Sequence, residues 1–284
     1  MVLGLKTIAI ANLMNNGNKN FMICLSKNKT DEYINMYAKG AGLPIHDYSY
    51  EHENKRAPIL IRSLGKRKLI HKCWETKRDF YYMDSGYLGN YKSPINEGGW
   101  KVFHRIVKND IQHSAIIERP SDRWEKLGIK IDKRKKTGRN ILLVMPSDKP
   151  CKFYGIDAEK WKQETIEQIK MHTDRPIVIR EKQPRHVRMQ KTIYQDLDNA
   201  YAMVTYQSIA AVESVLYGIP AFTLAPTAAD PVANKFLYNL ENPERYDKEY
   251  IYSWACHIAY GQFHIDELKK GKAHNMIMEE LYGS

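Results

Sequence analysis

Apolar residues in this chain of 284 residues come in short runs, and segments with helical periodicity lie between them. In the C-terminal half, residues 141–145, 176–179 and 202–206 are apolar runs of the kind found in buried strands. Asp157 is placed to cap a helix through Ile169, and a further helical pattern follows the third run. Strands alternating with helices are typical of a parallel sheet with helices on its faces. The hydrophobic pattern therefore predicts an α/β fold.

The N-terminal half shows the same alternation. Strands are predicted at residues 7–11, 57–61, 80–83 and 101–107, and helices at residues 30–40, 64–77 and 121–124. The length of the chain favours two domains, so we expect an N-terminal domain over residues 1–136 and a C-terminal domain over residues 137–284. From residue 245 onward the pattern is helical with breaks around Gly261 and Gly271, which predicts a helical tail.

The most informative segment is residues 202–220, which has the pattern of one β-α-β unit. Its apolar run ends in small polar residues, a helix is predicted to open at Ser208, and Gly218 closes that helix before another apolar run. The Ser208 hydroxyl and the free N–H groups of a helix N-terminus favour a phosphate. Glu213 lies further along the same helix, in position to reach ribose hydroxyls. The alternative is an ordinary helix of a doubly wound domain.

Polar residues also follow the other strands of this half. Ligands of open α/β sheets bind beyond the carboxyl ends of the strands. The candidate donor-binding residues at these ends are Ser147, Arg180, Lys182, Thr205 and Gln207, with Ser208 and Glu213. Arg180 and Lys182 are two residues apart, so both side chains would point to the same face if the strand continued. Two cations on one face suit a diphosphate. Surface charge at a strand end is the competing interpretation.

The best candidate base in the N-terminal half is Asp84, which follows the apolar run at residues 80–83. A carboxylate at the end of a strand can take the proton from an attacking hydroxyl group. An Asp that caps the turn at Gly86 is an equally good interpretation of the same residue.

Charge is the second informative property of the chain. The formal net charge is +11 and the sequence pI is about 9.3, which makes a polyanionic partner a reasonable expectation. Part of the excess lies in the basic run at residues 126–139. This run is either a strip that contacts phosphates or a solvated linker between domains.

Several function classes are disfavoured by what the sequence lacks. A Walker-type loop and a Gly-x-Gly-x-x-Gly after a strand are both missing, which speaks against kinases and nicotinamide dehydrogenases. The histidines and the four scattered cysteines show no metal-ligand spacing, so we expect no metal or other cofactor, and reduced, buried thiols. We find no apolar run long enough to span a bilayer and no secretory signal, so a cytoplasmic location is expected.

The order Ser208, Glu213 and then Gly218-Ile219-Pro220 resembles the nucleotide-sugar site of GT-B glycosyltransferases. The resemblance implies two Rossmann-like domains that face a cleft. It also implies a nucleoside diphosphate sugar as co-substrate and a reaction that needs no metal ion. The predicted function is transfer of a sugar from that donor to a hydroxyl group.

A second resemblance involves residues 81–92 and 101–109 together with Gln262-Phe263, Glu267 and residues 271–273 of the tail. These segments look like a group of uncharacterised phage-encoded glycosyltransferase-like proteins associated with DNA modification. The resemblance implies double-stranded DNA as partner, hydroxymethylated pyrimidines as acceptor, and an infected host cell as location. Tyr82, Tyr87 and Trp100 are then available to hold a flipped base.

If DNA is the acceptor, the predicted acceptor-binding residues are Tyr87, Lys92, Lys101, His104 and Arg105, with part of residues 130–139. A competing explanation is that His104 and Arg105 pair with a carboxylate inside their own domain. Three other functions stay open. They are a glycosyl- or glycerophospho-transferase of surface polysaccharide synthesis, a non-catalytic nucleic-acid-binding protein on this scaffold, and an epimerase of nucleotide sugars.

Overall fold

The computed structural model describes residues 22–49, 57–90, 102–133, 137–182 and 192–282. The chain divides into two compact units, and each is formed from separate stretches of sequence. Unit 1 comprises residues 1–84, 108–110 and 263–284, and unit 2 comprises residues 85–107 and 111–262. The domain boundary predicted at residue 136 therefore falls within unit 2.

The first sheet has six strands in the order β10-β5-β4-β3-β1-β2. Their bounds are β1 (Ile23–Leu25), β2 (Ile45–His46), β3 (Ile59–Arg62), β4 (Phe80–Ser85), β5 (Phe103–Lys108) and β10 (Gln262–His264). β1 pairs in parallel with both β2 and β3, and β3 pairs in parallel with β4. The strands predicted around residues 57–61, 80–83 and 101–107 are confirmed, whereas β1, β2 and β10 were not predicted. The strand predicted at residues 7–11 lies outside the described residues.

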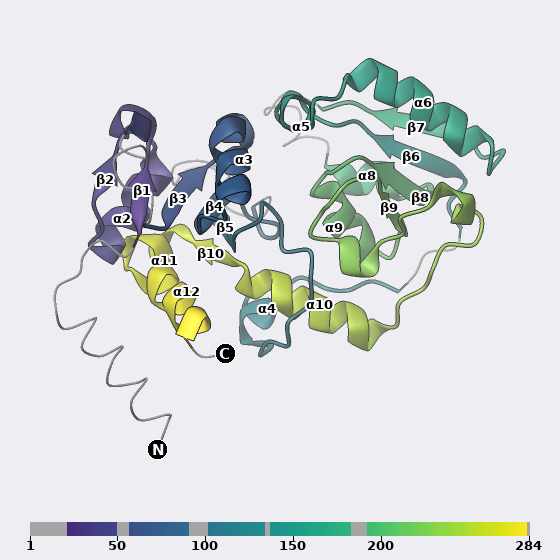
Figure 1. Ribbon diagram of the computed structural model, residues 1–284. Coiled ribbons are helices and arrows are strands. Elements are labelled where there is room, and N and C mark those ends of the chain that lie inside the picture. Colours follow the sequence, from purple (N-terminus) through teal and green to yellow (C-terminus); the bar gives the residue numbers. More distant parts are fainter. Residues whose placement is uncertain (1–21, 50–56, 91–101, 134–136, 183–191, 283–284) are drawn as a thin grey trace. The chain divides into compact units, whose positions relative to one another are not determined.

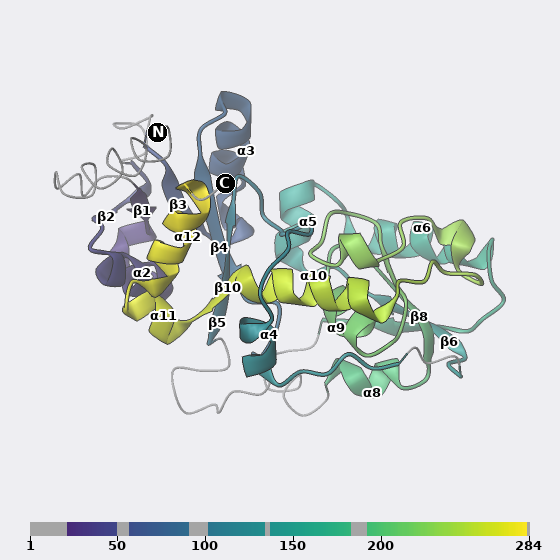
Figure 2. The same cartoon turned by 90° about the horizontal axis from the view of Figure 1, so that it is seen from below.

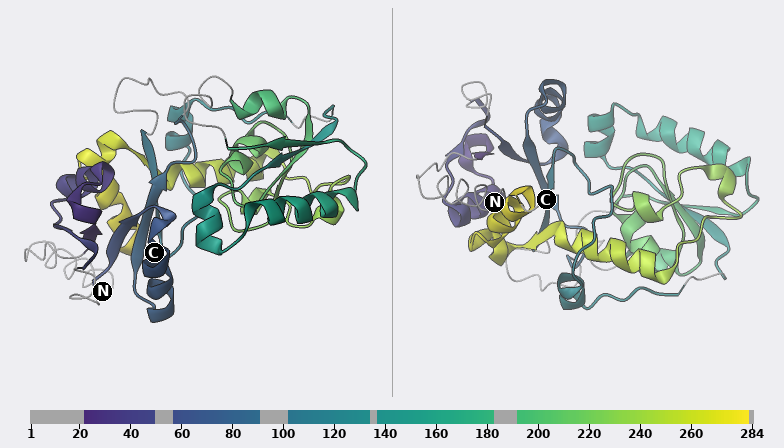
Figure 3. Two further views of the ribbon diagram at one scale, coloured as in Figure 1. Left: turned by 90° about the horizontal axis from the view of Figure 1, so that it is seen from above. Right: turned by 60° about the horizontal axis from the view of Figure 1, so that its bottom comes forward.

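The helices of unit 1 are α2 (Glu32–Ala41), α3 (Arg67–Thr76), α11 (Ile265–Lys269) and α12 (Lys272–Tyr282), and two 3-10 turns, η1 (Lys27–Lys29) and η3 (Leu64–Lys66), precede the first two. Asp31 caps α2 by accepting hydrogen bonds from the N–H groups of Tyr33 and Ile34. The helix runs past the predicted stop to Ala41 and is capped by Gly42, whose φ of 66° suits a glycine. Figures 1 and 3 show α11 and α12, in yellow, packed beside α2. The predicted helical tail is thus divided, because residues 263–284 belong to unit 1 and residues 245–262 belong to unit 2.

Unit 2 is built on a parallel sheet with the strand order β7-β6-β8-β9. Its strands are β6 (Asn140–Val144), β7 (Ile177–Arg180), β8 (Ala200–Thr205) and β9 (Ala221–Thr223). Its helices are α4 (Asp122–Leu127), α5 (Asp148–Tyr154), α6 (Ala158–Lys170), α8 (Ile193–Leu197), α9 (Ala210–Leu216) and α10 (Lys248–Tyr260), with the 3-10 turns η4 (Asp230–Val232) and η5 (Leu237–Asn239). The predicted strands and the helix capped by Asp157 are confirmed, but α5 and α8 were not predicted.

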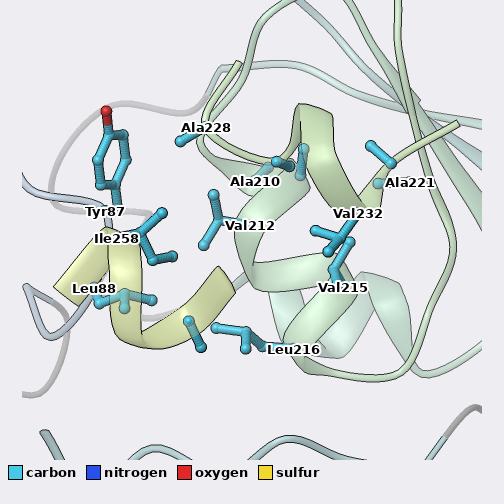
Figure 4. Close-up of a cluster of buried hydrophobic side chains, with 14 of the residues drawn as sticks. Tyr87, Leu88, Ala210, Val212, Val215, Leu216, Ala221, Ala228, Val232 and Ile258 are labelled. Carbon is cyan, nitrogen blue, oxygen red and sulfur yellow. The ribbon is translucent and has the colours of Figure 1, made fainter. Parts of the chain in front are cut away.

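Helices cover both faces of this sheet, as Figure 1 shows for α6 on one side and α8 and α9 on the other. Side chains that alternate along β6 enter two different cores because successive residues of a strand point to opposite faces. Ile141 and Leu143 pack with Trp161 of α6, whereas Leu142 and Val144 join the core formed around α9 and α10. Figure 2 shows the helices α9 and α10 of this unit, and Figure 4 shows the second core, in which Val212 of α9 lies toward Ile258 of α10. The predicted α/β class is confirmed, while the arrangement of two domains facing a cleft stays a prediction.

Two further sequence predictions can be compared with the structure. All four cysteines are free and buried, as expected for reduced thiols. Within the basic run, Ile129 and Ile131 pack against the core of unit 2, and the N–H of Asp132 donates to the Leu216 carbonyl oxygen. This part of the run is therefore attached to unit 2 and is not a freely solvated linker. None of the described helices is both long and apolar enough to cross a lipid bilayer.

Candidate functional site

The carboxyl ends of β6, β7 and β8 lie at one edge of the sheet in unit 2, because these strands are parallel and adjacent. Ser147 follows β6, Arg180 ends β7, and Ser208 follows β8. This is the edge at which open α/β sheets bind ligands. The order of the strands thus brings together residues that are far apart in the sequence.

Glu213 is the most unusual residue near this edge. It lies in the middle of α9, a helix whose seven residues are all buried, and only 8% of its surface is exposed. Burial raises the pKa of its carboxyl group from 4.5 to about 7, against the opposing effect of the Arg180 charge. Burial and the Arg180 charge determine this pKa, and no hydrogen bond contributes to it. A buried carboxyl group with a strongly shifted pKa is a good candidate for binding a ligand.

Arg180 forms an ion pair with Asp196 of α8. The two side chains are only 13% and 15% exposed. Arg180 was predicted as a cation for a diphosphate, and the structure places it in contact with a carboxylate and within electrostatic range of Glu213. Asp196 was missed by the sequence reasoning, because nothing in the local pattern around it indicates its partner.

The other predicted donor residues make contacts inside unit 2. The Thr205 hydroxyl donates to the Val144 carbonyl oxygen at 3.0 Å and ties β8 to β6. The Gln207 amide donates to the Tyr154 hydroxyl at 2.6 Å. Ser147 precedes α5 as its N-cap, without a side-chain hydrogen bond to the helix. These contacts fix the loops at the edge of the sheet, and the donor-binding role of the residues stays a prediction.

The Ser208 hydroxyl accepts a hydrogen bond from the N–H of Ala210 at 3.2 Å. The helix predicted to open at Ser208 begins at Ala210 and has seven residues, so its dipole is that of a short helix. The expectation that Lys182 and Arg180 lie on the same face of a strand does not hold, because β7 ends at Arg180. Lys182 is exposed, and its role also stays a prediction.

In unit 1, Asp84 is the second-last residue of strand β4, where it is half-buried. Its carboxylate accepts a hydrogen bond from the Tyr82 hydroxyl at 2.7 Å. Tyr82 and Asp84 are two residues apart on one strand and therefore share a face of the sheet. This hydrogen bond orients the Asp84 side chain at the carboxyl end of β4, and its role as a base stays a prediction.

Tyr87, His104 and Arg105, which were predicted to bind an acceptor, are buried, whereas Lys130, Lys133 and Arg139 of the basic run are exposed. His104 is fully buried, and Arg105 and Tyr87 are each 4% exposed. Arg105 donates to the carbonyl oxygens of Ser85 and Ile111 and lies over the Tyr87 ring. A cation held by carbonyl groups inside the protein does not offer its charge to a phosphate at the surface. Lys92, Lys101 and Trp100 lie outside the described residues.

Within the part of the chain that the structure describes, there is no group of three or more His, Cys, Asp or Glu side chains that could hold a metal ion. The predicted independence from metal ions and cofactors stays a prediction.

Solved structures with a similar fold are known. The KpsC beta Kdo 2,4 transferase of Thermosulfurimonas dismutans is 10% identical, with a TM-score of 0.52, and the match covers 91% of this chain and 98% of that one. The KpsC beta Kdo 2,7 transferase of the same organism is 11% identical, with a TM-score of 0.49, and the match covers 89% of this chain and 99% of that one. No protein-family model and no curated protein sequence matches the chain. At 10% identity, the first of these similarities shows a shared fold, and the resemblance to phage DNA-modifying proteins gains no support.

Proposed function

We propose that this protein is a glycosyltransferase that moves a sugar from a nucleotide-activated donor to a hydroxyl group of a glycan. In the reaction, the bond from the anomeric carbon to the donor phosphate breaks and a bond from that carbon to the acceptor oxygen forms. The acceptor proton passes to a base, and the nucleotide leaves with the phosphate. The GT-B resemblance of residues 208–220 and the fold shared with a Kdo transferase support this reaction class.

The single observation that carries the proposal is the Glu213 carboxyl group. It is nearly fully buried at the ligand-binding edge of a parallel sheet, beside the Arg180 cation. A carboxyl group in that position suits the vicinal hydroxyls of a ribose, and Arg180 suits a phosphate. Asp84 in unit 1 is the proposed base for the acceptor hydroxyl.

A glycan is a better supported acceptor than DNA. The groove predicted for DNA included His104 and Arg105, and both are buried. The structural neighbour with the higher score is a Kdo transferase, which acts on sugars. Surface polysaccharide synthesis, one of the alternatives left open by the sequence, is therefore the favoured setting.

The proposal is tested by incubating the protein with a panel of nucleotide sugars and with two acceptors, an oligosaccharide mixture and hydroxymethylated duplex DNA. Mass spectrometry then detects the added sugar mass. We expect a sugar-containing product from the oligosaccharides and none from DNA. Sugar added to DNA would overturn the acceptor assignment, and release of a free altered sugar would identify an epimerase.

Variants of Glu213 test the donor site directly. Loss of a charge-assisted hydrogen bond costs roughly 1.5 to 3 kcal/mol, so Glu213→Gln should weaken binding of the active nucleotide sugar about tenfold or more. Glu164→Gln, an exposed carboxylate on α6 of the same unit, is the matched control and should leave affinity unchanged. Equal affinity of wild type and Glu213→Gln would remove the main support for the proposal.

A separate pair of variants tests the base. Asp84→Asn should abolish turnover and spare donor binding, because the amide cannot accept the acceptor proton. Asp79→Asn is its control, since Asp79 lies before the other end of β4 and contacts Lys108 and Asn109. Full turnover of a folded Asp84→Asn protein would exclude Asp84 as the base.

A further inference from the structure

The sheet of unit 1 has a point at which the order of its strands reverses. The chain passes from β1 through α2 to β2 on one side of β1, whereas β3 and then β4 lie on the other side. These strands pair in parallel, so their carboxyl ends lie at one edge of the sheet. Open α/β sheets bind ligands at such a reversal, beyond the carboxyl ends of the two flanking strands. The edge between β1 and β3 is therefore a second place at which a ligand is expected.

Direct contacts connect the loops that follow β1, β2 and β3 at this edge. The N–H of Asn28, in the turn after β1, donates to the Asp47 carboxylate at 2.7 Å, and Asp47 directly follows β2. The next residue, Tyr48, has the Lys66 ammonium 3.6 Å from the centroid of its ring. Lys66 ends the turn η3 that follows β3. Side chains from three separate loops are thus held together where the strand order reverses.

The backbone of these loops adopts conformations that are uncommon for residues with a side chain. Asn28, Lys29 and Ser63 have positive φ angles of 51°, 56° and 75°, and they are three of the five such non-glycine residues in the described part of the chain. Ser63, with a ψ of 142°, lies close to a region that is populated almost entirely by glycine. Residues in such conformations gather at functional sites, where the surrounding structure holds them in place.

The charges at this edge are unevenly engaged. Asp47 accepts hydrogen bonds from two backbone N–H groups, and Asp31 forms an ion pair with Arg62 at 2.9 Å. Lys27 and Lys66 form no ion pair within the described residues. Burial and the nearby Lys27 charge lower the pKa of Lys66 against the opposing effect of Asp47, so a bound anion would stabilise its charged form. Two cations at an expected ligand site are thus left for an anion from outside.

We propose that Lys66 and Lys27 bind an anionic group, a carboxylate or a phosphate, of the acceptor glycan. Asp84, the proposed base, lies at the same edge on β4, next to β3. Neighbouring strands are about 4.8 Å apart, so roughly 10 Å separates the end of β4 from the end of β1, which a short oligosaccharide can span. The proposal rests on the function proposed above. It identifies the acceptor as an acidic glycan, which is a suitable partner for a chain with a net charge of +11.

The first experiment measures binding by calorimetry at fixed ionic strength, with pairs of probes that differ in charge. Hexagalacturonate is compared with its methyl ester, and pentamannose 6-phosphate with dephosphorylated pentamannose. Wild type should bind at least one acidic probe about tenfold or more tightly than its neutral counterpart, because charge-assisted hydrogen bonds have an effect of that size. A preference in the first pair identifies a carboxylate, and one in the second pair identifies a phosphate. Equal binding within both pairs, or no binding of any probe, would overturn the proposal.

Variants of the two lysines show whether the preference arises at this edge. Lys66→Met should reduce it about tenfold, and Lys27→Met should reduce it about threefold, because the Lys27 side chain is exposed. Lys66→Arg keeps the charge and should keep the preference. Lys39→Met is the matched control, since it removes the same charge from the last turn of α2, at the opposite edge of the sheet. A full preference in a folded protein that carries both Lys66→Met and Lys27→Met would overturn the proposal.

Transfer assays distinguish this proposal from the function on which it rests. Wild type should transfer sugar to the acidic fraction of the oligosaccharide mixture in preference to the neutral one. Lys66→Met should raise the KM for the acceptor much more than it changes kcat or the KM for the donor. Transfer to the neutral fraction alone would overturn the anion site and leave the proposed function standing. Absence of any transfer by the wild type would refute the proposed function, while the binding measurements would still decide whether the anion site exists.

Discussion

Glu213 makes the stability of unit 2 depend on pH in a direction that is unusual for a carboxyl group. Its pKa is 4.5 when exposed and about 7 in the folded protein, so the folded state binds more protons between these values. The stabilisation from the protonated form is therefore present below pH 4.5 and is lost as the pH rises through 7. The loss amounts to about 3 kcal/mol when the carboxyl group is fully ionised.

Glu213→Gln should remove this dependence, because the amide does not ionise and fills a similar volume. We expect the variant to be more stable than the wild type at pH 8 and similar to it at pH 5. Urea unfolding at several pH values measures the difference. Parallel curves for the two proteins across this range would show that the Glu213 carboxyl group is not buried as described.

Arg105 shows why a single residue can be misjudged from its type. The sequence suggested a surface cation for a phosphate, whereas the side chain donates to the Ser85 and Ile111 carbonyl oxygens and is 4% exposed. The competing sequence interpretation, a pairing with a carboxylate inside the protein, is closer to the structure, although the Ser85 and Ile111 acceptors are carbonyl oxygens. Arg105→Ala should accordingly lower the melting temperature of the protein without changing the salt dependence of any DNA binding. A normal melting temperature with a flatter salt slope would restore Arg105 to the DNA-binding surface.

At the scale of elements, the contact between α2 and α11 depends on a glycine. A Cβ atom built at Gly40 would lie 2.1 Å from the Leu268 carbonyl oxygen, so the two helices could not keep their positions. Gly40→Ala should therefore destabilise unit 1, even though alanine favours a helix by about 1 kcal/mol over glycine. Gly65→Ala is the control, since its Cβ meets only the Ser63 hydroxyl at 3.9 Å. Thermal unfolding compares the two, and an unchanged melting temperature in Gly40→Ala would contradict the close packing of α11 on α2.

The C-terminal end of α10 is surrounded by basic side chains that favour neutral histidines. Arg123 donates to the carbonyl oxygens of Ala259 and Gln262 at this end. His113 is half-buried as a residue, but its ring lies inside the protein. Burial of the ring lowers its pKa from 6.5 to about 3, and the neighbouring His257 and Arg105 contribute in the same direction. Burial and the Arg119 charge likewise lower the pKa of His257 to about 4.

Both histidines therefore bind protons more readily in the unfolded chain than in the folded one. Their contribution to stability is present above pH 6.5 and is lost as the pH falls toward 4 and 3, by about 1.4 kcal/mol per pH unit for each group. His257→Phe keeps an aromatic ring and should lose less stability than the wild type between pH 7 and pH 4. His172→Phe, two residues after the end of α6, is the control. If wild type and His257→Phe lose the same free energy of unfolding between pH 7 and pH 4, this histidine is not the cause of the loss.

Elements were predictable where their signals are local. The cap of Asp31 and the cap of Asp157 lie next to the helices that they start, so α2 and α6 were placed within a few residues. The strands β1, β2 and β10 have only two or three residues, and pairing with neighbouring strands defines them more than their own sequence does. Asp196 was invisible for the same reason, because its partner Arg180 is brought to it by the fold of unit 2.

At the scale of the whole molecule, the net charge of +11 predicts an attraction to polyanions that is independent of the reaction. We expect duplex DNA to bind with an affinity that falls by roughly 0.9 in log–log slope for each phosphate neutralised. The affinity should be equal for hydroxymethylated and unmodified DNA, because counterion release does not read the base. Sugar transfer to a glycan should continue when salt has abolished DNA binding. A salt titration tests this if DNA binding and sugar transfer are followed in the same samples. A preference for hydroxymethylated DNA that persists at high salt would support DNA as the acceptor.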